Sequence, residues 1–230
     1  MALIRHPAGT QISGSVGGVT YSHGRAGPIT RARSIPVNPN SVRQQLAKSV
    51  AAALSIAWSV DLTELQRSSW NAWAFAFPWS NKLGESSPMT DINAFVRANS
   101  ARMQAGLGRI DDPPVIIESA EPLAGISASG DASTQLISIS YGSGQGWAGE
   151  VGGYVLVYEG LPQNPGRSFF KGPFQLAEKI AGAVVPPASP QTVPATFPLV
   201  EGQKVWAKVV VTRADGRVAV AQTYPFLVTA

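Results

Sequence analysis

Few residues of this chain combine the type and the spacing that catalysis or metal binding requires. Cysteine is absent, and His6 and His23 are the only histidines, so the sequence excludes a thiolate centre and a multi-histidine metal site. Serine is common, but neither histidine lies near a recognisable nucleophile turn. Asp111 and Asp112 are adjacent, and an extended backbone sends adjacent side chains to opposite faces. These observations predict a protein that is not an enzyme and uses no metal or cofactor.

A glycine cluster at residues 14–18 is the other pattern that suggests chemistry. A phosphate-binding loop needs a following Gly-Lys-Ser/Thr and a strong preceding strand, and this cluster has neither. We therefore assign these glycines to backbone turns.

Charge is distributed unevenly along the 230 residues, whose net charge is +4. Residues 1–60 contain six basic side chains and no acidic one, whereas residues 111–230 contain more acids than bases. The first segment is therefore the candidate for docking on an acidic surface. Nucleic acid is the less favoured partner, because the arginines are sparse and only Tyr21 is available for stacking on a base.

Residues 1–37 read as an extended, basic, glycine-rich arm. Short apolar–polar alternation predicts a brief hairpin that turns at Gly17 and Gly18. Such a segment cannot bury enough apolar area to fold alone, so it is either a disordered tail or an arm that adds strands to a neighbouring subunit. On the second interpretation, the partner-binding residues are Ile12, Val16, Val19, Tyr21, Arg25, Arg31 and Arg33.

Residues 38–110 read as a helical domain that positions the tryptophans. Asn38-Pro39 is a typical helix start, and apolar residues then recur every four positions from Val42 to Trp58. Thr63 and Gln66 form a capping box for a second helix, which ends at Pro78. Because the link is short, the two helices should form an antiparallel hairpin. The expected core residues are Leu46, Leu54, Trp58, Trp70, Trp73, Phe77 and Phe95.

A third helix should begin after Thr90, with Asp91 in its first turn and Gly106 as its C-terminal stop. Residues 111–230 then read as an antiparallel β-sandwich, which makes the fold class α+β. The expected strands are Val115–Ser119, Leu136–Tyr141, Tyr154–Tyr158, Lys204–Thr212 and Val218–Phe226. Two irregular stretches, Gly160–Gly172 and Gly182–Pro198, are either partner-binding tip loops or plain connections.

The last two strands, with Trp206 in a valine-rich strand and an Asp-Gly turn at 215–216, resemble the closing strands of a fibronectin type III or immunoglobulin-like domain. That fold is used mainly for adhesion and display, and fold alone does not determine function.

The order of segments in residues 10–100 resembles a group of phage and prophage virion proteins. The matching segments are Ser13–Tyr21, Arg31–Asn40, Leu62–Trp70 and Asn93–Asn99. This resemblance implies a structural protein of the virion, made in the host cytoplasm, which is an accessory, decoration or connector component of the capsid or tail. It implies other virion proteins as partners, and a homo-oligomer in place.

Two further functions stay open on the sequence alone. The β domain and its proline-rich loop suit a receptor- or glycan-binding module of a phage tail, and the arginines of the arm suit an accessory of nucleic-acid packaging. The longest apolar runs are shorter than the ~18 residues of a membrane span, and the first residues lack the apolar core of a signal peptide.

Overall fold

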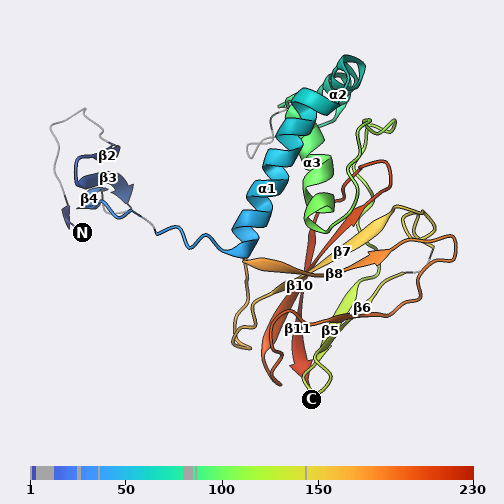
Figure 1. The fold of residues 1–230 in the computed structure, drawn as a ribbon. Coiled ribbons are helices and arrows are strands. Elements are labelled where there is room, and N and C mark those ends of the chain that lie inside the picture. The colour runs from blue at the N-terminus through green and yellow to red at the C-terminus, as the bar shows by residue number, and fades with distance from the viewer. Residues whose placement is uncertain are drawn as a thin grey trace. The chain divides into compact units, whose positions relative to one another are not determined.

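A computed structural model describes residues 2–3, 13–24, 27–35, 37–79, 85, 87–142 and 144–230. The fold is mixed α+β, with three α-helices and two sheets in this described part (Figure 1). The chain divides into two compact units, Met1–Val42 and Arg43–Ala230. The predicted boundary between a helical and a β domain at residue 110 stays a prediction, because both parts belong to the second unit.

The arm forms a small antiparallel sheet instead of a fully extended chain. Its strands are β1 (Ala2–Leu3), β2 (Gly14–Val16), β3 (Val19–Gly24) and β4 (Gly27–Ala32), in the order β1-β4-β3-β2. The predicted hairpin is present, since Val16 pairs with Val19 across a turn in which Gly17 has a φ of +59°. That left-handed conformation is one that glycine adopts without steric cost.

The first helix, α1 (Val42–Ile56), continues into a π-helical turn, Ala57–Asp61. The prediction that it begins at Pro39 is wrong. Asn40 has a φ of +47°, and its N–H donates to Oδ1 of Asn38, so an Asx-type turn precedes the helix.

The second helix, α2 (Glu64–Ala76), begins with the predicted capping box, in which Thr63 and Gln66 satisfy each other's backbone N–H groups. The predicted antiparallel hairpin is wrong, because the chain bends by 120° between the first helical segment and α2. The π-helical turn redirects the chain, and α2 packs against α3 (Asp91–Gln104).

The helices share one apolar core. Seven of its largest members are Leu54, Leu62, Trp70, Trp73, Phe77, Phe95 and the half-buried Trp58. Helix α3 begins and ends at the predicted residues: Asp91 lies in the first turn, and Gly106, with a φ of +70°, follows the last turn. The prediction that Thr90 caps the helix is wrong in one respect, because its side chain makes no cap hydrogen bond. The N–H of Leu107 bonds the carbonyl of Arg102, which completes a Schellman motif.

A seven-stranded sheet closes into a sandwich in the order β8-β7-β10-β11-β5-β6-β9. Its strands are β5 (Ser127–Asp131), β6 (Leu136–Ser140), β7 (Tyr154–Gly160), β8 (Phe174–Ala181), β9 (Gln191–Pro194), β10 (Lys204–Thr212) and β11 (Gln222–Thr229). All neighbouring strands pair antiparallel except β11 and β5, which pair parallel.

Three strand predictions need correction. Residues 115–119 form no strand, and Val115 is almost fully exposed. The return strand is regular only from Gln222 instead of Val218. The predicted turn at 214–217 is present, since Thr212 pairs with Val218, but the pairing is interrupted before Gln222 pairs with Val209. Strand β9 lies inside the stretch 182–198 that was expected to be irregular.

Strand β10 organises the sandwich, because both of its faces are buried. Val205, Ala207, Val209 and Val211 point into the core between the sheets, as their alternation predicts. On the other face, Val210 packs with Leu156 beneath the end of α3. This contact joins the helices to the outer face of the four-stranded half of the sheet (Figure 1).

Candidate functional site

The arm sheet places three of the expected partner-binding residues on one face. Directly paired residues of neighbouring strands share a face, and Val16 pairs with Val19, while Val19 and Tyr21 are two residues apart on β3. Val16 is 73% exposed, Val19 is also exposed, and Tyr21 is half-buried. No side chain described between residues 13 and 41 is buried. The sheet therefore has an apolar face but no core of its own.

The described arginines do not gather on this apolar face. Arg31 pairs with Thr20, so it lies on the face opposite Tyr21. The N–H of Arg33 bonds the carbonyl of Gly18, just beyond the end of β4. Both side chains are exposed. The predictions for Ile12 and Arg25 fall outside the described residues.

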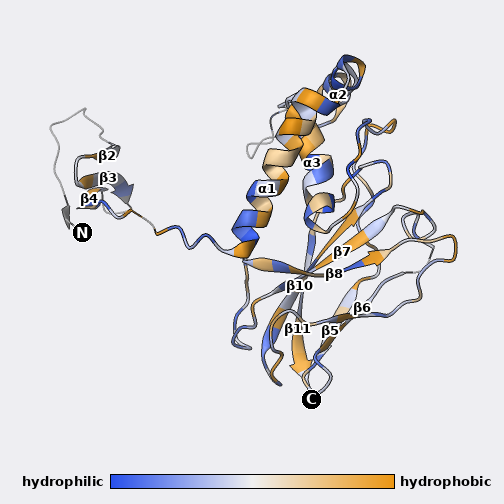
Figure 2. Cartoon of the chain, in the orientation of Figure 1, coloured by the Kyte–Doolittle hydropathy of each residue, from blue (hydrophilic) through white to orange (hydrophobic). Residues whose placement is uncertain are grey.

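Helix α1 buries only Val50 and Leu54 among its 15 residues. A second row of side chains runs along the helix at alternating intervals of four and three residues, which is the spacing of a coiled-coil seam. We call this row the α1 seam: Val42, Leu46, Ser49, Ala53, Ile56 and Val60. All six are exposed, and four of them are large and apolar. Figure 2 shows both hydrophilic and hydrophobic stretches along α1.

The prediction that Leu46 belongs to the helical core is wrong. Its side chain is 45% exposed and lies on the α1 seam, whereas Leu54, two turns later, is fully buried. The physical reason is that α2 and α3 cover only the C-terminal half of α1, so the first two turns meet no helix.

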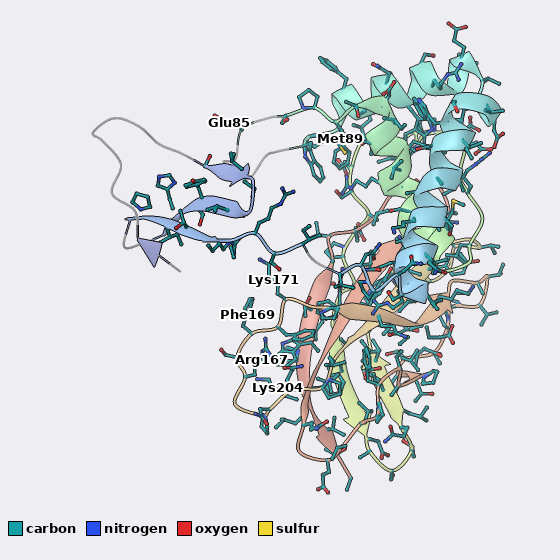
Figure 3. The ribbon with its side chains drawn as sticks, turned by 60° about the vertical axis from the view of Figure 1, so that its left-hand side comes forward. Glu85, Met89, Arg167, Phe169, Lys171 and Lys204 are labelled. Atoms are coloured by element: carbon teal, nitrogen blue, oxygen red, sulfur yellow. The ribbon has the colours of Figure 1, made fainter. Side chains whose placement is uncertain are left out.

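A second exposed surface lies on the loop between β7 and β8, within the predicted tip loop Gly160–Gly172. Phe169 is 64% exposed and is flanked by Arg167, whose Nε donates to the Phe169 carbonyl, and by Lys171. Figure 3 shows these three side chains along one flank of the sandwich, next to Lys204 of β10. The loop thus presents one large ring among cations.

Aromatic stacking holds this loop on the sheet. Phe170 stacks on Trp206 of β10 with the ring centroids 5.3 Å apart, and both side chains are buried. Nζ of Lys204 lies 5.4 Å from the centroid of the Trp206 ring on the same sheet face. Since Phe170 faces the sheet, its neighbour Phe169 faces solvent.

The adjacent acids Asp111 and Asp112 act as structural cross-links. Asp111 pairs with Arg109 at 2.5 Å, and Arg109 also pairs with Asp61 at 2.7 Å. Hydrogen bonds with these two carboxylates raise the pKa of Arg109. Oδ1 of Asp112 accepts from Gln66, and the indole of Trp70 donates to the Asp111 carbonyl. These contacts tie α2 to the start of the β region.

Sequence reasoning missed the α1 seam, although its signal is present. A four-residue period from Val42 to Trp58 and a four–three period from Val42 to Val60 share their first two residues. The four-residue period predicts that Leu46 and Leu54 are both buried. In the structure, Leu54 follows that period into the core, whereas Leu46 lies on the exposed seam. Nothing in the sequence distinguishes Phe169 from Phe170, because either ring could face the sheet.

Among the described residues, no single helix is long and apolar enough to cross a membrane. Comparison of the chain with protein-family models, with curated proteins and with solved structures gives no match in any of the three.

Proposed function

We propose that this chain is a non-enzymatic structural protein of a phage particle, an accessory, decoration or connector component of the capsid or tail. It attaches to neighbouring subunits through its N-terminal arm, and the partners are other virion proteins, including further copies of this chain. The observation that carries the proposal is the arm sheet, in which no described side chain is buried. An isolated sheet of this size gains apolar burial only against another surface.

The arm suits attachment by strand addition. Strand β2 is an edge strand of the sheet, and an edge presents backbone groups that can pair with another chain. Val16, Val19 and Tyr21 would then be covered by the neighbour, and the basic, acid-free composition of residues 1–60 favours an acidic partner surface.

The α1 seam is a second docking surface, on the helical block. Arg43, beside the seam, donates a hydrogen bond to the carbonyl of Phe174 in β8, so its guanidinium is engaged within the subunit. The side chains that flank the seam on its other side, Gln45, Ala52 and Ser59, are small or neutral. We infer that an amphipathic helix of a neighbouring virion subunit packs on this seam.

The sandwich is proposed to be of the fibronectin type III or immunoglobulin-like kind. Seven strands, with β5, β6 and β9 on one side and β8, β7, β10 and β11 on the other, support this assignment. Tyrosine is absent from β10, the sixth strand, so a tyrosine corner gives no support.

Deletion of residues 2–36 tests the attachment role. The truncated protein should stay folded, because the unit from Arg43 to Ala230 has its own cores, but it should no longer enter particles. The readout is the amount of the protein in purified particles, relative to the full-length chain at equal expression. Normal incorporation of the truncated protein would overturn the proposal.

A receptor- or glycan-binding module of a phage tail is the second candidate, and the exposed Phe169 favours it. An aromatic ring among cations can stack on a sugar and pair with its acidic substituents. On a glycan array, the full chain should bind acidic glycans, and Phe169→Ala should abolish the signal, whereas the exposed Phe75→Ala should not. Absence of binding by the full chain would remove this candidate.

A further inference from the structure

The guanidinium of Arg97 on α3 lies against two adjacent aromatic rings. Its Cζ lies 5.0 Å from the ring centroid of Phe77 and 4.7 Å from that of Trp79. The two ring centroids are themselves 6.4 Å apart. These contacts fix the position of the guanidinium and leave its N–H edges as the part that is free to bind.

No anion balances this cation in the described part of the chain. Arg97 forms no ion pair and donates no hydrogen bond there, in contrast to Arg102 and Arg109 on the same helix and its following loop. Burial lowers the pKa of Arg97, and no carboxylate offsets this effect. A guanidinium that loses water without gaining an acceptor is a site that an added acceptor would stabilise.

The guanidinium lines a shallow hollow of about 10 Å³, which has room for about one water molecule, between the helices and the sandwich. Trp73, Ala94 and Ala98 form an apolar wall, and Arg217 and Glu118 lie on the sandwich side. Arg217 is already paired with Asp215 at 2.7 Å, so Arg97 is the cation that is available to a ligand.

We propose that Arg97 is a receptor for one carboxylate, which it binds in bidentate fashion at the mouth of this hollow. The planar fork of a guanidinium matches the two oxygens of a carboxylate. A phosphate dianion fits less well, because there is one available cation and Glu118 lines the same hollow. The carboxylate comes from an acidic side chain, a chain terminus or a free acid.

Titration of the full-length chain with small carboxylates tests the proposal. The probes are N-acetylglutamate amide for a side chain, N-acetylalanine for a chain terminus, isobutyrate for a free acid, and inorganic phosphate and chloride at matched ionic strength. The readouts are the Nε–Hε resonance of Arg97 and the fluorescence of the half-exposed Trp79. We expect saturable shifts with a dissociation constant on the order of millimolar for at least one carboxylate.

Variants separate binding from a purely structural role. Arg97→Gln should abolish the saturable fluorescence shift. Arg97→Lys should weaken carboxylate binding at least about fivefold, because an ammonium lacks the planar pair of N–H donors of a guanidinium. Arg167→Gln is the matched control, since Arg167 also lies over a ring, that of Phe170, but already has acceptors. It should bind as the wild type does.

Three outcomes would overturn the assignment. They are a response to carboxylates no larger than the response to chloride, tighter binding of phosphate than of any carboxylate, and unchanged saturation in the Arg97→Lys variant. The wild-type titration decides the question even where Arg97→Gln fails to fold. The carboxylate probe that binds most tightly identifies the source.

Discussion

Arg102 shows at the residue scale how one side chain joins the helices to the sandwich. It is buried, and its guanidinium donates to the carbonyl groups of Gly152 and Arg213 and to the hydroxyl of Thr212, at 3.0 to 3.3 Å. Burial lowers the pKa of Arg102. The charge is stabilised by these acceptors without a direct carboxylate contact in the described residues.

We expect Arg102→Met to lower the free energy of unfolding by about 2–4 kcal/mol, because the buried Thr212 hydroxyl and two partly buried carbonyl groups lose their donor. Arg167→Met, on the exposed loop, should change it by less than about 0.5 kcal/mol. Urea denaturation followed by tryptophan fluorescence measures both. A loss below about 1 kcal/mol in Arg102→Met would show that the contact is dispensable.

Glu159 is the other buried charged residue that stands out. Its Oε2 accepts from the N–H groups of Thr196 and Phe197, while Oε1 is buried without a partner in the described residues. Burial raises the pKa of Glu159 above its ordinary 4.5, and the two backbone donors oppose that effect in part.

The raised pKa predicts a pH-dependent stability. The folded state holds the proton of Glu159 more tightly than the unfolded state does. The stability that this proton contributes is fully present below pH 4.5, the ordinary pKa, and is lost as the pH rises through the folded pKa. Glu159→Gln should therefore gain stability relative to the wild type between pH 5 and pH 8. Unfolding free energies across this range provide the test, with the exposed Glu201→Gln as control. A stability difference that does not change with pH would contradict it.

Helix α1 has two different sides at the element scale. One side, with Val50 and Leu54, is buried in the subunit, whereas the α1 seam faces outward. Because seam residues make few contacts within the subunit, their substitution should separate assembly from folding.

Leu46→Glu combined with Ile56→Glu should change the free energy of unfolding by less than about 1 kcal/mol in total, and should abolish incorporation into particles. Leu54→Ala is the contrasting variant, expected to cost about 2–5 kcal/mol because it leaves a cavity in a fully buried site. Thermal unfolding and particle content are measured side by side. Normal incorporation of the double variant would exclude the seam from the interface.

The whole molecule combines an arm in which no described side chain is buried and a body with two large cores. This asymmetry predicts that loss of the arm leaves the stability of the body unchanged. None of the described arm side chains is buried, so we expect its removal to cost the body little apolar burial.

Trypsin should cut the isolated protein first at Arg31 or Arg33, both of which are exposed. The remaining fragment should unfold within about 2 °C of the intact chain, since a change below ~0.5 kcal/mol shifts the midpoint of a domain of this size by about that amount. Mass spectrometry of a digestion time course and a thermal scan give the result. Protection of the arm for as long as the body would indicate that the arm is ordered without a partner.

Local signals in the sequence were sufficient for several elements. The capping box of Thr63, the stop at Gly106, the hairpin at Gly17 and the alternation of β10 all depend on contacts within a few residues, and the structure has each of them. The virion role suggested by the order of segments is a proposal that still depends on the experiments above.

Only the tertiary structure decided which apolar residues are covered. Leu46 and Leu54 have the same residue type and the same helical period, but α2 and α3 reach only the second. Three other features likewise depend on residues far apart in the chain. They are the 120° bend after α1, the outward position of Phe169 and the contacts of Arg97 with two aromatic rings. A sequence pattern shows which apolar side chains would be stabilised by burial. Long-range packing determines which of them are buried within one subunit.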